Sequence, residues 1–270
     1  MLQRANLALV GLLVVTSAAT AGTLTDLNAV LTYDVDVAST TGLGPWVVDL
    51  VTHMNTQWFW YRTGDMDREA SINTLGPPAM LPTNGDFDAG DERLVVQYTA
   101  NAFTITVDVV LTGGGAGSGW ADVAEVVAVQ NTGAEPLEFH LFQFCNPVIN
   151  NTVLDDVGSI LGGNTAYVGD VPGAALETVV APRPDQYAIG SAATLLAALD
   201  DAATTDLGQE AGPVGPNANV AWALQWDVVL NPQGTFLMSA DKILSTPEPA
   251  TMALMGLGLT ALVTVLRKRT

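Results

Sequence analysis

Two short segments hold the residue types best suited to binding chemistry. The first, Trp58-Phe59-Trp60-Tyr61, places four aromatic residues in a row. Successive side chains of a β-strand point to opposite faces, so Trp58 and Trp60 would share one face. Aromatic rings usually bury in a core, but on an exposed face they stack on sugar rings. Trp58 and Trp60 therefore belong either to the core or to a glycan-stacking surface.

The second segment runs from Asn84 to Glu92 and alternates acidic residues with glycines. Oxygen-bearing side chains at Asn84, Asp86, Asp88 and Asp91 are the ligand type that calcium prefers. The segment departs from the EF-hand pattern, because the twelfth position counted from Asn84 is Val95 and not glutamate. It is expected to be either a solvated acidic turn or a calcium site, and no other cofactor is predicted.

The motifs of common catalytic sites are missing from the sequence. His53 and His140 do not occur in zinc-binding spacing, and there is no G-x-S-x-G or P-loop motif. Paired carboxylates such as Asp155-Asp156 arise by chance among 28 acidic residues, so they do not identify a glycosidase. No catalytic residue is predicted, and the protein is expected not to be an enzyme.

Charge is distributed unevenly along the chain. Between Asp26 and Glu248 lie all 28 acidic residues but only five of the nine basic ones, which gives this stretch a net charge of about −23. Such a field repels nucleic acid and anionic lipid, so neither is an expected partner; it favours solubility or the recruitment of divalent cations. Lys242, the only lysine of this stretch, is expected at the surface. Cys145, the only cysteine, excludes an internal disulfide and is expected to be buried and unreactive.

Alternation of apolar and polar residues dominates this acidic stretch and predicts β-strands. The glycine-rich loop from Gly113 to Gly119 and the turn from Asn131 to Pro136 are both expected to connect hairpins. One segment, Ser191 to Asp201, is rich in helix formers, with Ser191 as its N-cap. Many short strands and one helix predict an all-β fold, a two-sheet antiparallel β-sandwich over residues 22–245. The expected strands are 31–37, 47–51, 58–62, 93–99, 103–111, 123–129, 137–145, 177–180, 220–230 and 235–244.

The two ends of the chain have the features of targeting segments. Residues 1–21 combine Arg4, a short apolar region and the cleavage site Ala19-Thr20-Ala21, as in a secretory signal peptide. At the other end, Pro247-Glu248-Pro249 precedes 17 uncharged residues, Ala250 to Leu266, and a basic end. A helix of that length spans roughly 25 Å, which is adequate for a membrane when its basic flanks snorkel. The basic end, Arg267, Lys268 and Arg269, is expected to stay cytoplasmic, so the body would be exported.

The tail is either a plain membrane anchor or a sorting signal. Pro-Glu-Pro, the hydrophobic stretch and the basic end together resemble the PEP-CTERM sorting signal of Gram-negative bacteria that make exopolysaccharide. The resemblance covers about residues 246–269 of the tail, residues 246–270, and the body resembles no characterised family. It implies recognition by exosortase, a membrane peptidase, a transient stay in the inner membrane, and delivery to the cell surface or extracellular matrix. The sorting residues would be Pro247, Glu248, Pro249, Arg267, Lys268 and Arg269.

Three functions remain open for the body. The leading hypothesis is a non-enzymatic surface or matrix protein associated with exopolysaccharide. The second is a carbohydrate-binding module, calcium-dependent or not, that uses Trp58 and Trp60. The third is a polysaccharide-active enzyme.

Overall fold

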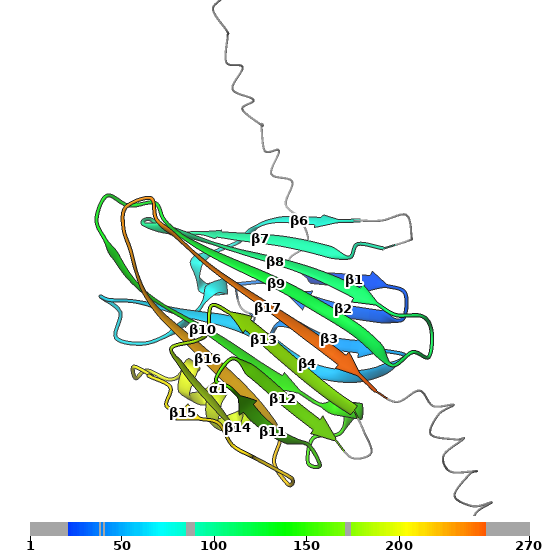
Figure 1. Cartoon of the computed structure of the whole chain (residues 1–270). Helices are drawn as coiled ribbons and strands as arrows, with labels where there is room; N and C mark the ends of the chain where they lie inside the picture. The colour runs from blue at the N-terminus through cyan, green and yellow to red at the C-terminus, as the bar shows by residue number, and fades with distance from the viewer. Residues whose placement is uncertain (1–20, 38, 40, 85–89, 171–173, 247–270) are drawn as a thin grey trace, which may run out of the picture.

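The computed structural model describes residues 21–37, 39, 41–84, 90–170 and 174–246, which form a mostly β structure with one short helix. Two large twisted sheets, called sheet A and sheet B, lie face to face (Figure 1). Among the described residues every neighbouring pair of strands is antiparallel except β14 and β15. The expected all-β class with antiparallel sheets and a short helix is therefore confirmed.

Sheet A has the order β1-β2-β3-β4-β10-β16-β14-β15, with β5 paired to β4. Its strands are β1 (Ala21–Asp26), β2 (Ala29–Asp34), β3 (Gly42–Val48), β4 (Val51–Thr63), β5 (Ala70–Ser71), β10 (Leu137–Pro147), β14 (Gln186–Ser191), β15 (Gln209–Glu210) and β16 (Val220–Leu230).

Sheet B has the order β11-β12-β13-β17-β9-β8-β7-β6. Its strands are β6 (Ala79–Thr83), β7 (Arg93–Thr99), β8 (Phe103–Gly113), β9 (Trp120–Asn131), β11 (Val157–Leu161), β12 (Thr165–Asp170), β13 (Ala174–Ala181) and β17 (Thr235–Ser245). The chain crosses between the sheets after β5, β9, β10, β13 and β16, so each sheet is built from separate parts of the sequence.

The strongest sequence patterns gave the most accurate strands. The expected strands 93–99 and 220–230 coincide with β7 and β16, and the glycine-rich loop joins β8 to β9 in a hairpin. The expected strand 47–51 is wrong, because Asp49 and Leu50 adopt positive φ angles of 49° and 69° and turn the chain between β3 and β4. The turn after Asn131 is not a hairpin, since it carries the chain from β9 in sheet B to β10 in sheet A.

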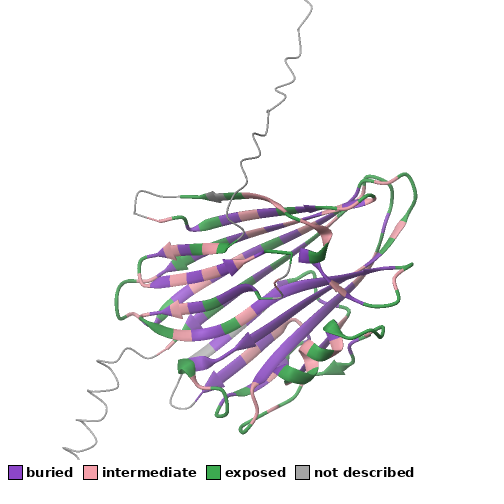
Figure 2. Cartoon of the chain, turned by 180° about the vertical axis from the view of Figure 1, so that it is seen from behind, coloured by how far each residue is buried: buried purple, intermediate pink, exposed green. Residues whose placement is uncertain are grey.

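The helix α1 (Ala192–Asp200) follows β14, as expected for the segment after Ser191, although the Ser191 side chain makes no capping hydrogen bond. It packs on β10, β14 and β16, on the side of sheet A that faces away from sheet B. Most of β16 is consequently buried on both faces, whereas β8 and β17 alternate between buried and more exposed positions (Figure 2). Two short 3₁₀ turns, η1 (Ile72–Leu75) and η2 (Ile149–Asn151), lie after β5 and β10.

A charged pair lies inside the core. Lys242, expected at the surface, is 0 % exposed, and its Nζ lies 2.7 Å from Glu125 Oε2. Gln57 Nε2 donates to both oxygens of Glu125 at 2.6 and 2.8 Å, and Gln143 Nε2 donates to Oε2 at 3.1 Å. We call Gln57, Glu125, Gln143 and Lys242 the core polar cluster; it joins β4 and β10 of sheet A to β9 and β17 of sheet B. The surface expectation for Lys242 is wrong because the residue occupies an inward position of β17, two residues from the buried Ala240.

Cys145 is buried as expected and lies beside this cluster. Its Sγ is 3.6 Å from the sulfur of Met54, and burial raises the pKa of its thiol far above the ordinary value. The thiolate is the reactive form of cysteine, so a thiol with a strongly raised pKa is unreactive at neutral pH.

Candidate functional site: a polar pocket on sheet A

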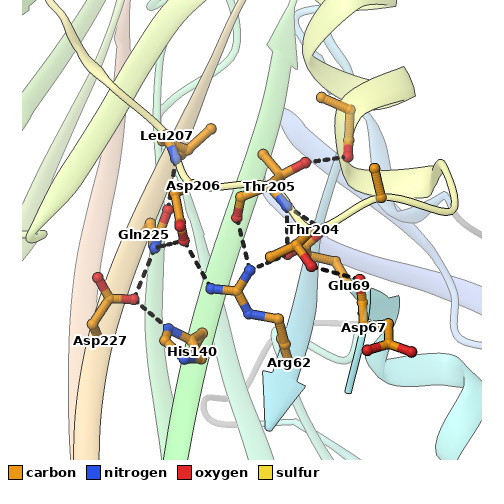
Figure 3. A network of polar contacts seen from close by, with 12 residues as sticks. Arg62, Asp67, Glu69, His140, Thr204, Thr205, Asp206, Leu207, Gln225 and Asp227 are labelled. Carbon is orange, nitrogen blue, oxygen red and sulfur yellow. Dashed lines mark hydrogen bonds and ion pairs between the residues drawn. The ribbon is translucent and has the colours of Figure 1, made fainter. Parts of the chain in front are cut away.

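A row of polar side chains crosses the outer face of sheet A, where β4, β10 and β16 lie side by side (Figure 3). The strand registers place His140 directly opposite Arg62 on one neighbouring strand and opposite Asp227 on the other. Directly opposite residues share a face of the sheet. Gln143 lies three residues after His140 on β10, an odd number, so its side chain points to the opposite face, inward to the core polar cluster. We call Arg62, His140 and Asp227 the polar row.

Carboxylates hold Arg62 on two sides. Its Nη1 lies 3.0 Å from Glu69 Oε1, and its Nη2 lies 2.8 Å from Asp206 Oδ1. Nη1 also donates to the carbonyl oxygen of Thr205 at 3.2 Å, and the guanidinium carbon lies 5.9 Å from the centre of the Phe142 ring. The Glu69 side chain is 0 % exposed whereas that of Asp206 is 60 % exposed. Glu69 therefore binds the guanidinium on its buried side, and Asp206 binds it on the side that faces solvent.

His140 is fixed by a carboxylate of its own. Its Nδ1 lies 2.6 Å from Asp227 Oδ1, and its Nε2 lies 3.5 Å from Glu138 Oε1. Asp227 Oδ1 also accepts a hydrogen bond from Gln225 Nε2 at 2.8 Å, and Gln186 Nε2 lies 3.5 Å from Asp227 Oδ2. The Asp227 carboxylate therefore sets the orientation of the imidazole ring, so that Nε2 points toward the exposed side chain of Glu138.

The loop that follows α1 closes one side of the site. Leu207 donates its backbone N–H to Gln225 Oε1 at 2.8 Å, and Gln225 Nε2 lies 3.3 Å from Asp206 Oδ1. The hydrogen bond from Arg62 lowers the pKa of Asp206, so this carboxylate stays ionised at neutral pH. Gln225 thus links Asp206, in the loop, to Asp227, on the sheet.

An open pocket of about 430 Å³ lies over the polar row. Three carboxylates and one arginine line it, so its charge is negative. Its mixture of planar donors and acceptors suits a small ligand rich in hydroxyl groups. The lining residues besides the polar row are Thr63, Gly64, Met66, Glu138, Gln186, Thr204 and Asp206.

Trp58 and Trp60 lie outside this pocket surface. They are 0 % and 1 % exposed, and their indole N–H groups donate to Asn73 Oδ1 at 2.9 Å and Asp200 Oδ1 at 2.7 Å. The glycan-stacking hypothesis is wrong for these two residues, because neither ring is available to a ligand. Both rings instead pack in the core, which was the alternative expectation.

Only part of the expected calcium segment can be placed. Asp86 and Asp88 lie outside the described residues; Asn84 Nδ2 lies 2.5 Å from the carbonyl oxygen of Gly90, and Asp91 is exposed. Within the described part of the chain, no three or more His, Cys, Asp or Glu side chains gather in a way that could hold a metal ion. Calcium binding at Asn84 to Asp91 stays a prediction.

The signal peptide, residues 1–21, lies outside the described residues apart from Ala21, and so do all six expected sorting residues, Pro247, Glu248, Pro249, Arg267, Lys268 and Arg269. The last described residue, Thr246, donates its backbone N–H to the carbonyl oxygen of Gly119 at 2.8 Å, so the tail leaves the body beside the β8–β9 hairpin. Across the ranges that the structure describes, no helix is long and apolar enough to cross a membrane.

Sequence reasoning did not find the polar row. Each of these three residues, Arg62, His140 and Asp227, lies within an expected strand. Alternation predicts which residues of the same strand point to the same side as it does, but nothing about other strands. The sequence holds no signal for which strands pair or in which register, so it could not bring the three together.

Comparison with known proteins finds one match for the tail and others for the fold of the body. The family model of the PEP-CTERM protein-sorting motif matches residues 245–269. That model covers the tail alone, and no curated protein matches the chain in sequence.

Several solved structures share the fold at low sequence identity. A protein assigned as an aldose 1-epimerase from Escherichia coli K12 has a TM-score of 0.57 at 10 % identity, over 84 % of this chain and 99 % of its own. The Slr1438 protein from Synechocystis sp. PCC 6803 has a TM-score of 0.57 at 9 % identity, over 84 % and 96 %. A bacterial glucoamylase, solved in complex with acarbose, has a TM-score of 0.54 at 12 % identity over 89 % of this chain, which spans only 34 % of the glucoamylase. The chain therefore carries a PEP-CTERM sorting motif, typical of exported proteins that are sorted to the cell surface, behind a body with this shared two-sheet fold.

Proposed function

We propose that the protein is a non-enzymatic component of the cell surface or extracellular matrix, released there by exosortase, and that its body binds carbohydrate of the exopolysaccharide. The single observation that carries the binding function is the polar row beneath an open pocket. Arg62, His140 and Asp227 are each fixed by further hydrogen bonds, so their remaining polar atoms are presented in a set geometry. Such preorganised planar groups suit the paired hydroxyls of a sugar ring.

The charge of the pocket narrows the class of sugar. Glu138, Asp206 and Asp227 outnumber Arg62, and the body as a whole is strongly acidic. An anionic polymer rich in uronate would be repelled. A neutral oligosaccharide is the ligand that the pocket fits best, and the fold it shares with a sugar epimerase and a glucoamylase is consistent with that choice.

A glycan array tests this proposal with the full-length protein and two pocket variants. The wild type is expected to bind neutral oligosaccharides, and His140→Gln and Asp227→Asn are expected to weaken binding about 10-fold, the usual effect of losing one hydrogen bond to a ligand. Asp241→Asn, at an exposed position of sheet B, is the matched control and should bind as the wild type does. If His140→Gln and Asp227→Asn bind as strongly as the control, this pocket is not the binding site. If the wild type binds no glycan on the array, the remaining proposal is a purely structural role.

One observation favours a second candidate, a carbohydrate-active enzyme. The 2.6 Å contact between His140 Nδ1 and Asp227 Oδ1 is an arrangement in which histidine can act as a general base or acid. An enzyme would release product from a polymer or interconvert sugar anomers, and His140→Gln would abolish that turnover. A ligand that binds without any turnover supports the non-enzymatic proposal instead.

The sorting proposal has its own test at the C-terminus of the mature protein. Exosortase is expected to cleave near Pro247-Glu248-Pro249, so mass spectrometry of protein from native cells should find the end of the chain there. Cells that lack exosortase serve as the control and should retain the apolar span and the basic end. An intact Thr270 in protein from wild-type cells would instead indicate a plain anchor.

A further inference from the structure

Asp156 and Asp170 form a pair of facing carboxylates at one end of the β11–β12 hairpin. The register pairs Val157 with Gly169, so Asp156 and Asp170 are the next two residues to face each other. Opposite residues of an antiparallel pair share a face, with Cβ atoms about 5 Å apart, and like charges at such positions are destabilising. Asp170 ends β12 of sheet B and Asp156 directly precedes β11, so the aspartate pair belongs to a different sheet from the polar row.

The aspartate pair is buried and short of hydrogen bonds. Asp156 is 0 % exposed, and among the described residues neither of its carboxylate oxygens has a hydrogen-bond partner of good geometry. Asp170 is 9 % exposed; its Oδ1 is also without a partner, and its Oδ2 accepts a hydrogen bond from Asn150 Nδ2 at 2.9 Å. Apart from the Ile149 backbone N–H, which acts on Asp156, the described residues offer these three buried carboxylate oxygens no donor, although buried polar atoms nearly always have one.

Among the described residues, no positive charge compensates the aspartate pair. None of the ion pairs of the described residues includes Asp156 or Asp170. His53, which accepts the backbone N–H of Asn150 at 3.2 Å, stays neutral because burial lowers its pKa to about 4. Burial, together with the charges of Asp170 and Asp155, raises the pKa of Asp156 to about 7, against a smaller opposite effect of the Ile149 N–H.

The backbone around the aspartate pair is also specialised. Asn150 and Asn151 adopt positive φ angles of 57° and 59°, and this turn carries the Asn150 amide to Asp170. On the other side Gly215, with a φ of 97°, passes so close that an added Cβ would lie 2.1 Å from the carbonyl oxygen of Asp156. Asparagine adopts positive φ more readily than other residues with a side chain, so the pair Asn150-Asn151 suits this turn.

We propose that the aspartate pair, with Asn150, binds a calcium ion. Two carboxylates supply up to four oxygens, and the Asn150 amide carries an oxygen on the carbon that bears Nδ2. Calcium takes six to eight oxygen ligands in flexible geometry and accepts carbonyl and water oxygens for the remainder. The ion supplies a positive charge that the described part of the chain does not place there, and this site is separate from the Asn84 to Asp91 segment.

Thermal unfolding of the full-length protein at pH 8, where Asp156 is ionised, tests the proposal. Extracellular calcium sites have a Kd of about 10⁻⁴–10⁻³ M, so 10 mM CaCl₂ is expected to raise the melting temperature by about 5 °C over a sample in EGTA. The variant Asp156→Asn with Asp170→Asn should lose this rise and should melt above the wild type in EGTA, because the repulsion is gone. The exposed neighbour Asp155→Asn is the matched control and should keep the rise.

Two further variants show whether the effect of calcium on the melting temperature comes from the aspartate pair or from the Asn84 to Asp91 segment. Asp86→Ala with Asp88→Ala removes the other candidate segment and should leave the rise intact; a rise that only this variant abolishes overturns the proposal. So does the absence of any rise in the wild type. Asp170→Asn alone is the fallback should the double variant not fold, and calorimetric titration should show calcium affinity at least 10-fold weaker than in the wild type. Unchanged affinity would equally overturn the proposal.

Discussion

Replacement of Lys242 by methionine is expected to lower the free energy of unfolding by about 3–5 kcal/mol, the usual effect of breaking a fully buried ion pair. Lys242 and Glu125 are both 0 % exposed at their side chains, with 2.7 Å between Nζ and Oε2. Without the ammonium group, Glu125 keeps the amide donors of Gln57 and Gln143 but loses its counter-charge. Urea unfolding of wild type and variant measures the difference.

The double variant Glu125→Leu with Lys242→Met separates the buried charge from the loss of packing. Because both charges are absent, it is expected to be more stable than Lys242→Met alone, although two amide groups lose their acceptor. A single variant that loses less than about 1 kcal/mol would contradict the importance of this ion pair. A double variant whose loss of stability equals the sum of the losses of Lys242→Met and Glu125→Leu, each measured alone, would contradict it as well.

Arg62→Met is expected to have the second-largest effect, a loss of about 3 kcal/mol of stability. The reason is Glu69, whose side chain is 0 % exposed. It would remain buried, and the backbone N–H of Thr205, at 3.1 Å from each carboxylate oxygen, would be its one remaining donor among the described residues. The exposed partner, Asp206, adds little to this effect because water screens it. Its pKa should nevertheless rise toward the ordinary value in the variant, since the Arg62 hydrogen bond is the main cause of its depression.

Arg93→Met provides the matched control for Arg62→Met. Arg93 forms an ion pair that is shorter than those of Arg62, 2.6 Å from Nη2 to Asp108 Oδ2, but its side chain is 50 % exposed. Removing an exposed pair of this kind costs about 0–1 kcal/mol. Urea unfolding of the two variants compares them directly, and equal losses would show that burial of Glu69 is not what makes Arg62 important.

The strands could be predicted where one side of a sheet faces water. In β7 and β8 buried and less buried residues alternate, and the expected strands match these two closely. The short strands β1, β11 and β12 were not predicted, because short strands contain too few alternating positions to stand out. The strand expected over 47–51 failed for a different reason, since its apolar residues hide a tight turn at Asp49 and Leu50.

The candidate sites were harder to predict than the strands. Trp58 and Trp60 gave the clearest local signal for binding, yet both are in the core. The residues of the polar row gave no local signal, because each is an ordinary polar residue in its own strand. In the sequence, Asp155-Asp156 is an ordinary chance pair of acids, and the notable partner of Asp156 is Asp170, 14 positions away and across a hairpin.

By itself, the sequence determined the sorting tail, the acidic character of the body and its mostly β structure. These depend on composition, on residue order within a few positions, or on a period of two, all of which are local properties of the chain. Only the tertiary structure decided that Lys242 is buried against Glu125, that His140 lies between Arg62 and Asp227, and that Asp156 faces Asp170. Each of these depends on which strands pair and in which register, and that is set by the packing of the two sheets, to which residues far apart in the sequence contribute together.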